Sequence, residues 1–275
     1  MLKQRIITAV IMAAVFFVAL FGLSTAIFAS VCLVALLVAV HEWARLAGVR
    51  HRGVEFILLF LFLAAGLLAV FGTGLAPGTG FPPLLVGIAG GAATLFWIAV
   101  APAWLRNGWP TRAPLPMSIL GALLILAFWI SGIELHAHSP WLLLGTLAIV
   151  WIADTGAYFS GRRFGKRKLA PTISPGKSWE GVYGGLACVL AYAAAVLALS
   201  PLRSAGPRMA LTIAVAAVLL AMISVVGDLF ESWLKRQAGV KDSGTLLPGH
   251  GGVLDRIDAL LPALPLATLF LRAVS

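Results

Sequence analysis

The feature that most constrains this chain is a succession of long apolar runs separated by short polar segments. The first run extends from about residue 6 to Val40 without a charged side chain, which is too long for the 7–15-residue core of a signal peptide. A break near residues 22–25 divides it into two segments, each close to the roughly 20 residues that a helix needs to cross a bilayer. Together with the later runs, this pattern predicts about nine transmembrane helices, at about residues 6–22, 25–44, 54–72, 82–104, 115–134, 140–160, 179–199, 208–230 and 253–271.

Composition agrees with a membrane protein. Hydrophobic residues occupy 61% of the 275 positions, against roughly 45–50% in soluble domains. We therefore expect an all-α polytopic integral membrane protein with a single membrane domain over residues 1–275. Its N-terminal spans would cover about residues 6–134, and the chemically active C-terminal part about residues 140–275. Pro262 and Pro265 interrupt the last run, so this span is expected to be kinked or short.

The basic residues predict how these helices are oriented. With the N-terminus in the cytoplasm, 17 of the 20 Lys and Arg residues fall in cytoplasmic segments, as the positive-inside rule requires. Nine of the ten acidic residues, all except Glu134, lie on or near the same face, so the active site is expected to face the cytoplasm. The basic residues lie in short loops between apolar runs, where lipid headgroups and phosphorylated substrates are nearer partners than nucleic acid.

Five of the ten acidic residues lie within residues 228–258, between two apolar runs. Ionisable groups at a membrane boundary are costly and are usually retained for function, so this block is the first candidate for an active site. Four of its polar residues are spaced i, i+3, i+4 and i+7 and share one face if the helix continues through them: Asp228, Glu231, Ser232 and Lys235.

Three aspartates of this block indicate a metal site. Carboxylates that converge at a boundary repel one another unless cations are present, and hard divalent cations take oxygen ligands. We therefore expect Asp228, Asp255 and Asp258 to hold Mg²⁺, with two ions per site as one option. An ion pair with a neighbouring Lys or Arg is the alternative for any single aspartate, and we favour it for Asp242, which follows Lys241.

The segment Gly249-His250-Gly251-Gly252 forms a glycine-rich loop. Its glycines permit positive φ and a close approach of the backbone to a ligand. His250 has three interpretations, namely contact with a phosphate, capping of the next helix, and proton transfer.

The second polar block carries six cations between Arg162 and Lys177. Such a loop either anchors the chain beside anionic lipid or binds phosphate groups. The turn that contains Ser174, Lys177 and Ser178 favours phosphate binding, because hydroxyls flank a lysine and a glycine lets backbone amides approach an anion.

Two glycine patterns, at residues 87–91 and 181–185, are typical of membrane helices that pack closely. Packing within one chain and packing across a dimer are the two interpretations.

The run from Ser232 to Asp258 reads S-x-L-K-R-x4-K-D-x-G-x2-L-P-x-H-G-G-V-x-D-R-I-D. It resembles the signature of the CDP-diacylglycerol synthases, also called phosphatidate cytidylyltransferases. The block over residues 154–181 is similar to a second motif of that family: Asp154-Thr-x-Ala-Tyr158, Gly161-Arg162, Ser174-Pro-x-Lys177-Ser178 and Glu180-Gly181.

This resemblance implies transfer of the cytidylyl group of CTP to phosphatidate, with Mg²⁺ required, in the inner membrane and in a dimer. By similarity Asp228, Asp255 and Asp258 match the metal-binding carboxylates. The residues expected to act in catalysis are Asp228, Asp255, Asp258, Lys235 and Arg256. Those expected to bind substrate or phosphate are Arg162, Ser174, Lys177, Ser178, Ser232, Arg236, Lys241, His250, Gly251 and Gly252.

Two other functions compete with this one. A secondary transporter would carry ionisable residues at the bilayer midplane and an inverted repeat, whereas the polar residues here gather at one face and no repeat is found. A membrane phosphotransferase acting on polyprenyl phosphate would use similar carboxylates and Mg²⁺. Only the run over residues 232–258 separates it from a cytidylyltransferase.

The predicted topology can be tested by labelling. A cysteine placed within residues 162–177 should react only with reagents that reach the cytoplasm, whereas one near Arg203 should react with an impermeant maleimide from outside. The reverse pattern of labelling in intact cells would rule out this topology.

Overall fold

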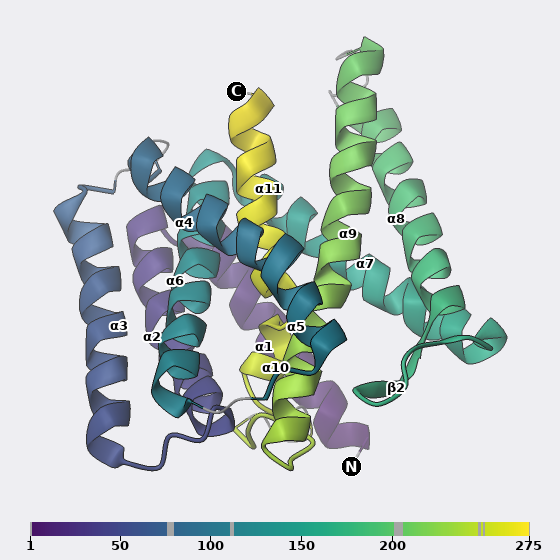
Figure 1. The fold of residues 1–275 in the computed structure, drawn as a ribbon. Helices are drawn as coiled ribbons and strands as arrows, with labels where there is room; N and C mark the ends of the chain where they lie inside the picture. Colours follow the sequence, from purple (N-terminus) through teal and green to yellow (C-terminus); the bar gives the residue numbers. More distant parts are fainter. Residues whose placement is uncertain are drawn as a thin grey trace.

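The computed structural model of this chain describes residues 2–75, 80–110, 113–200, 206–246, 249 and 251–274. Within those residues the protein is an all-α membrane bundle with one β-hairpin (Figure 1). In the described part of the chain, seven segments are long and apolar enough to cross a bilayer: α2 (Thr25–Leu46), α3 (Arg52–Gly72), Pro83–Asn107, α6 (Pro114–His138), α7 (Pro140–Phe164), α8 (Trp179–Leu199) and α9 (Gly206–Gln237). The segment Pro83–Asn107 contains α4 (Pro83–Leu95), the π-helix η1 (Phe96–Val100) and α5 (Ala101–Asn107).

The expected count of nine spans is not confirmed within the described residues. Of α1 (Leu2–Gly22), the described side chains form a shorter apolar helix over Ile7–Gly22. The last apolar run forms α10 (Leu254–Ile257), which has four residues, and α11 (Leu260–Val274), which has 15. Because a span needs about 20 residues, α11 is short, as its two prolines predict.

The break between α10 and α11 brings two aspartates together. Proline has no amide hydrogen, so Pro262 cannot donate to the carbonyl of Asp258 four residues earlier. Gly227 of α9 lies directly against this carbonyl, since a Cβ at Gly227 would be 2.3 Å from the Asp258 oxygen. This close approach of two backbones places Asp228 near enough to Asp258 for their charges to interact.

An aromatic cluster fixes the C-terminal half of α9. The ring centroid of Phe230 lies 5.3 Å from that of Trp233, 5.7 Å from that of Trp97 and 6.1 Å from that of Trp43. Edge-to-face pairs contribute about 0.5–1.5 kcal/mol beyond area burial. The Trp43 indole also donates to the Met117 carbonyl at 3.0 Å. The cluster thus packs α9 against α2 and η1, while the Trp43 hydrogen bond joins α2 to α6.

Glycines allow α7 and α8 to pack closely. A Cβ at Gly185 would lie 2.7 Å from the carbonyl oxygen of Ala153, and one at Gly181 would lie 2.9 Å from that of Ala157. For the glycine pattern at residues 181–185, packing within one chain is confirmed. A Cβ at Gly87 or Gly91, by contrast, would meet nothing within 4 Å, and a dimer contact there stays a prediction.

A β-hairpin connects α7 to α8, where the sequence predicts only a loop. Strands β1 (Lys168–Ala170) and β2 (Ser174–Ser178) are antiparallel and pair Lys168 with Ser178. The Glu180 carboxylate fixes the hairpin base by accepting from the amides of Lys166 and Arg167 at 3.0 and 3.2 Å. Figure 1 shows the hairpin, the N-terminus and the segment after α9 near one end of the bundle, with the C-terminus at the other.

The glycine contact gives a prediction about stability. Gly185→Val should lower the free energy of unfolding by roughly 1–3 kcal/mol, because its side chain overpacks the backbone of α7. Gly91→Val is the matched control, since it makes the same change in an apolar helix with open space around it. Thermal unfolding of both variants in detergent would measure the difference, and equal melting temperatures would contradict the packing described here.

Candidate active site

The two polar blocks of the sequence meet at an ion pair between Lys177 of β2 and Asp228 of α9. The Lys177 Nζ and the Asp228 Oδ2 lie 2.6 Å apart, and the two side chains are 23% and 28% exposed. The Ser232 hydroxyl donates to the other Asp228 oxygen at 3.3 Å. The structure therefore places residues from both predicted blocks in a single site.

A polar pocket of about 490 Å³ surrounds this ion pair, and we call it the hairpin pocket. Its walls come from α7, the β-hairpin, α8 and α9, and its volume is within the roughly 300–1,000 Å³ of small-molecule sites. Asp154 and Tyr158 of α7 line it. Neither was among the expected site residues, although both belong to the second motif. The expected residues that line it are Arg162, Ser174, Lys177, Ser178 and Asp228.

Besides Lys177 and Ser232, three more of the expected phosphate-binding residues have partners within the chain. The Ser178 hydroxyl oxygen caps α8 by accepting from the Gly181 amide at 3.2 Å. Arg162 donates to the Tyr158 hydroxyl at 3.3 Å, and Arg236 donates to the Ile173 carbonyl at 3.4 Å. Arg236 therefore ties the turn of the hairpin to the end of α9.

Lys235 lies between two carboxylates. Its Nζ is 2.7 Å from Asp255 Oδ1 and also pairs with Glu231 one turn earlier. The Lys235 side chain is only 12% exposed, and its single positive charge is shared between these two carboxylates. Direct contact between Lys235 and a substrate phosphate stays a prediction, and it would require one of these pairs to open.

Asp255 organises the glycine-rich loop. Its Oδ2 accepts from the amides of Ser243 and Gly252 at 2.9 and 2.8 Å. Burial alone would raise the pKa of Asp255, but the hydrogen bonds from Lys235 and these amides outweigh burial and lower the pKa to about 2. Gly251 has a φ of 83°, and a Cβ there would lie 2.6 Å from Asp255 Oδ2. The glycines predict that the backbone of this loop approaches a ligand closely. In the structure it approaches the Asp255 carboxylate instead.

The three expected Mg²⁺ ligands do not form one cluster. Among the described residues, no group of three or more His, Cys, Asp or Glu side chains is placed to hold a metal ion. Both oxygens of Asp255 accept within the chain, one of them from two backbone amides, whereas the oxygens of Asp228 contact the side chains of Lys177 and Ser232. Asp228 and Asp258 fit a metal better, because burial and the nearby Asp228 charge raise the pKa of Asp258 to about 7, and a cation would relieve this repulsion. Mg²⁺ is often held by one or two carboxylates together with substrate phosphates and water.

The remaining expected residues are spread around the site. Lys241 and Arg256 are exposed, and Arg256 borders a separate apolar cavity. His250 lies outside the described residues, so its three interpretations stay predictions.

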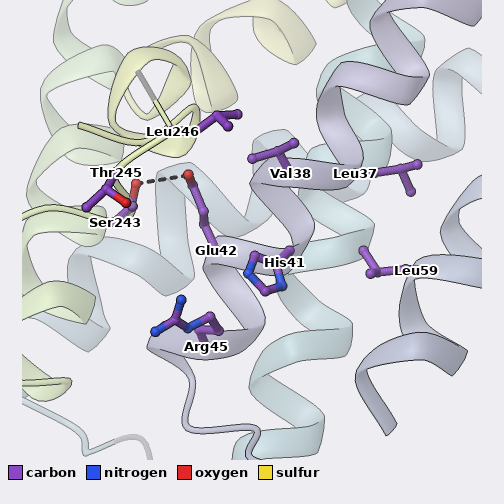
Figure 2. A pocket seen from close by; sticks show the side chains of 10 residues that line it. Leu37, Val38, His41, Glu42, Arg45, Leu59, Ser243, Thr245 and Leu246 are labelled. Atoms are coloured by element: carbon purple, nitrogen blue, oxygen red, sulfur yellow. Dashed lines mark hydrogen bonds between the residues drawn. The ribbon is translucent and has the colours of Figure 1, made fainter. Parts of the chain in front are cut away.

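Glu42 of α2 is a residue that the sequence did not predict in the site. It is 3% exposed and accepts from the amides of Val253 and Leu254 at 3.1 and 2.8 Å. Its Oε2 is also 3.0 Å from the Ser243 hydroxyl oxygen. Figure 2 shows this contact at the wall of a pocket of about 460 Å³. The sequence feature that could have identified Glu42 is a single carboxylate at the end of an apolar run, where charges are costly.

Ser243 connects Glu42 to Asp255. Its hydroxyl lies 3.0 Å from an oxygen of each carboxylate, and its one hydrogen can be donated to only one of them at a time. Gly244 and Gly252 make room for Glu42, since a Cβ at either position would lie 2.3 or 2.4 Å from a Glu42 oxygen. Glu42 therefore fixes the loop that carries Asp255.

Comparison with known proteins adds an independent finding. Residues 3–274 match the model of the cytidylyltransferase family. The chain is 40% identical over 283 residues to the phosphatidate cytidylyltransferase of Pseudomonas aeruginosa, covering 99% of this chain and 98% of that protein. It is 39% identical over 293 residues to the enzyme of that name from Haemophilus influenzae, covering 98% of each, and 37% identical over 232 residues to that of Brucella suis, covering 84% and 78%.

We expect Glu42→Gln to loosen the loop, because one amide oxygen replaces two acceptors and an NH₂ group then faces backbone donors. Limited proteolysis within residues 241–252 should become faster, and turnover should fall by roughly tenfold to a hundredfold, as displacements of about 1 Å can cause. The matched control is Glu55→Gln on α3, which removes a carboxylate that pairs with His41. Wild-type proteolysis and turnover in Glu42→Gln would contradict this role.

Proposed function

The chain belongs to the cytidylyltransferase family, and we propose that it transfers the cytidylyl group of CTP to phosphatidate. An oxygen of the phosphatidate phosphate attacks the α-phosphorus of CTP, and the bond to the β-phosphate oxygen breaks. The products are CDP-diacylglycerol and pyrophosphate. The observation that carries the proposal is the Lys177–Asp228 ion pair inside the hairpin pocket, in a chain similar over nearly its whole length to proteins named phosphatidate cytidylyltransferase.

The nucleophile of this reaction needs little activation. A phosphate monoester has a second pKa near 6, so the phosphatidate headgroup is largely dianionic at neutral pH. The barrier lies in bringing this anion to an anionic nucleotide. Positioning and electrostatic stabilisation are therefore the main contributions of the protein, as in other phosphoryl transfers. No covalent intermediate on a side chain is required.

We assign the lipid phosphate to the hairpin pocket. Lys177 and Arg162 supply positive charge there and Ser174 a hydroxyl. The hairpin lies near one end of the bundle (Figure 1), so a lipid phosphate can enter the pocket from the plane of the bilayer. A phosphate at Lys177 competes with Asp228 for the ammonium group, and its arrival frees the Asp228 carboxylate.

Asp228 and Asp258 are the residues that we assign to magnesium. One or two Mg²⁺ ions bound there would supply positive charge that offsets repulsion between the substrates and stabilises the leaving pyrophosphate. Asp255, whose oxygens are engaged with Lys235, Ser243 and Gly252, is instead assigned to positioning of the glycine-rich loop.

The long apolar helices, of which the described residues contain seven, make this chain a multi-pass membrane protein. We propose that it resides in the inner membrane with the hairpin pocket open to the cytoplasm, where CTP is found. The homodimer implied by the sequence resemblance stays a prediction. Family membership favours this function over both the transporter and the polyprenyl phosphate transferase.

The proposal is tested by incubating the purified full-length chain with labelled CTP, phosphatidate and Mg²⁺. A labelled CDP-lipid should form, and excess chelator should abolish its formation. No labelled lipid from active, folded protein would overturn the assigned reaction, whereas full turnover in chelator would overturn only the metal assignment.

Two variants separate the roles within the site. Asp228→Asn should lower kcat by orders of magnitude, because metal-borne charge stabilisation contributes several kcal/mol. Lys177→Ala should chiefly raise the KM for phosphatidate. Arg163→Ala is the matched control, since it removes a cation at the end of α7 that stacks on Phe164 and does not line the pocket. A Lys177→Ala effect on CTP alone would require a different assignment of the hairpin pocket.

A further inference from the structure

A third cavity, almost entirely apolar, lies between helices and opens to the outside of the bundle, since Phe17 and Trp151 of its lining are 43% and 42% exposed. Its volume is about 530 Å³, and its walls come from α1, α2, α6, α7 and the α10–α11 segment. Side chains such as Phe16, Phe28 and Trp129 form the lining. Among the described residues that line it, Arg256 is the only one with a charge. We call this space the apolar cavity.

One face of α7 runs from the apolar cavity to the hairpin pocket. Leu143, Leu147 and Trp151 line the apolar cavity, whereas Asp154 and Tyr158 line the hairpin pocket. These five residues are three or four positions apart and therefore share one side of the helix. At 1.5 Å per residue, the step from Trp151 to Asp154 rises only about 4.5 Å. The change from apolar to polar lining thus occurs within one turn.

The α10–α11 segment provides a second connection between the two spaces. Arg256 borders the apolar cavity, and Asp258, two residues later, is close enough to Asp228 and Lys177 for their charges to interact. A cation therefore lies at the edge of an apolar space whose neighbouring pocket contains the candidate phosphate-binding lysine. A molecule with an anionic head and an apolar tail complements this arrangement.

We propose that an acyl chain of the lipid substrate occupies the apolar cavity while its phosphate lies in the hairpin pocket. The inference rests on the proposed function, since it states where the apolar part of phosphatidate is held. Lipid tails are as apolar as the lining, so a chain gains no hydrophobic energy on leaving the bilayer. Discrimination must come from close packing, and the shape of the cavity then determines which acyl chains are accepted.

Small lining residues provide the kinetic test. Ala13 of α1 and Ala35 of α2 both line the cavity, so Ala13→Phe and Ala35→Phe should partly fill it. Each should raise the KM for long-chain phosphatidate by roughly fivefold or more and leave the KM for CTP and for a dihexanoyl substrate unchanged. Ala14→Phe is the matched control, because Ala14 is exposed on the same helix and does not line the cavity. Equal KM values for long-chain substrate in all three variants and the wild type would overturn the proposal.

A binding experiment on the wild-type chain is independent of turnover. Phosphatidic acid with a photoreactive diazirine on its acyl chain should label peptides of α1, α2 and α7 that line the cavity, including the one that contains Cys32. Excess unlabelled phosphatidic acid should suppress this labelling, whereas phosphatidylcholine should not. Labelling spread evenly over lipid-facing helices, or suppressed equally by both lipids, would show ordinary bilayer contact and overturn the inference. A wrong reaction assignment would give a different result. The chain would then make no CDP-lipid, although the cavity would still be labelled specifically.

Discussion

The polar end of this bundle is held together by buried and half-buried carboxylates that require partners. Leaving one member of a buried ion pair uncompensated costs roughly 3–5 kcal/mol, so each carboxylate fixes the groups around it. Glu42 accepts from the loop before α10, Asp255 accepts from Lys235 and the same loop, and Asp228 pairs with Lys177. At the other end of the bundle, the Glu134 carboxylate also fixes its neighbours. It accepts from Arg272 and from the Phe81 amide at 2.8 Å each.

Much of the helical framework follows from the sequence because the bilayer requires long apolar segments. The run expected at residues 179–199 forms α8 with the same bounds. The run expected to end near residue 230 instead continues to Gln237, since Glu231 and Lys235 pair along the helix and their charges do not end it. Pro262 and Pro265 correctly predict a short last helix, whereas the nine spans expected from hydropathy are not confirmed in the described residues.

The contacts that build the site were harder to predict because they join distant parts of the chain. Glu42 and the residues that it binds are more than 200 positions apart, and no local pattern marks such a pair. The glycine-rich loop shows a different limit. Its glycines correctly indicate a close approach of the backbone, but they do not specify the approaching group, which in the structure is the Asp255 carboxylate. The hairpin was missed because its short strands have no apolar alternation.

The hydrogen bonds of Glu42 also bear on how such a protein can change over evolution. Glu42 belongs to the first 134 residues, whereas Ser243, Val253 and Leu254 belong to the last part of the chain. A chimera that joined the N-terminal half of one relative to the C-terminal half of another would combine a carboxylate and a loop from different parents. Ser139 alone separates α6 from α7 at the junction of the two parts, and the loop keeps its anchor where the N-terminal part supplies a carboxylate at position 42.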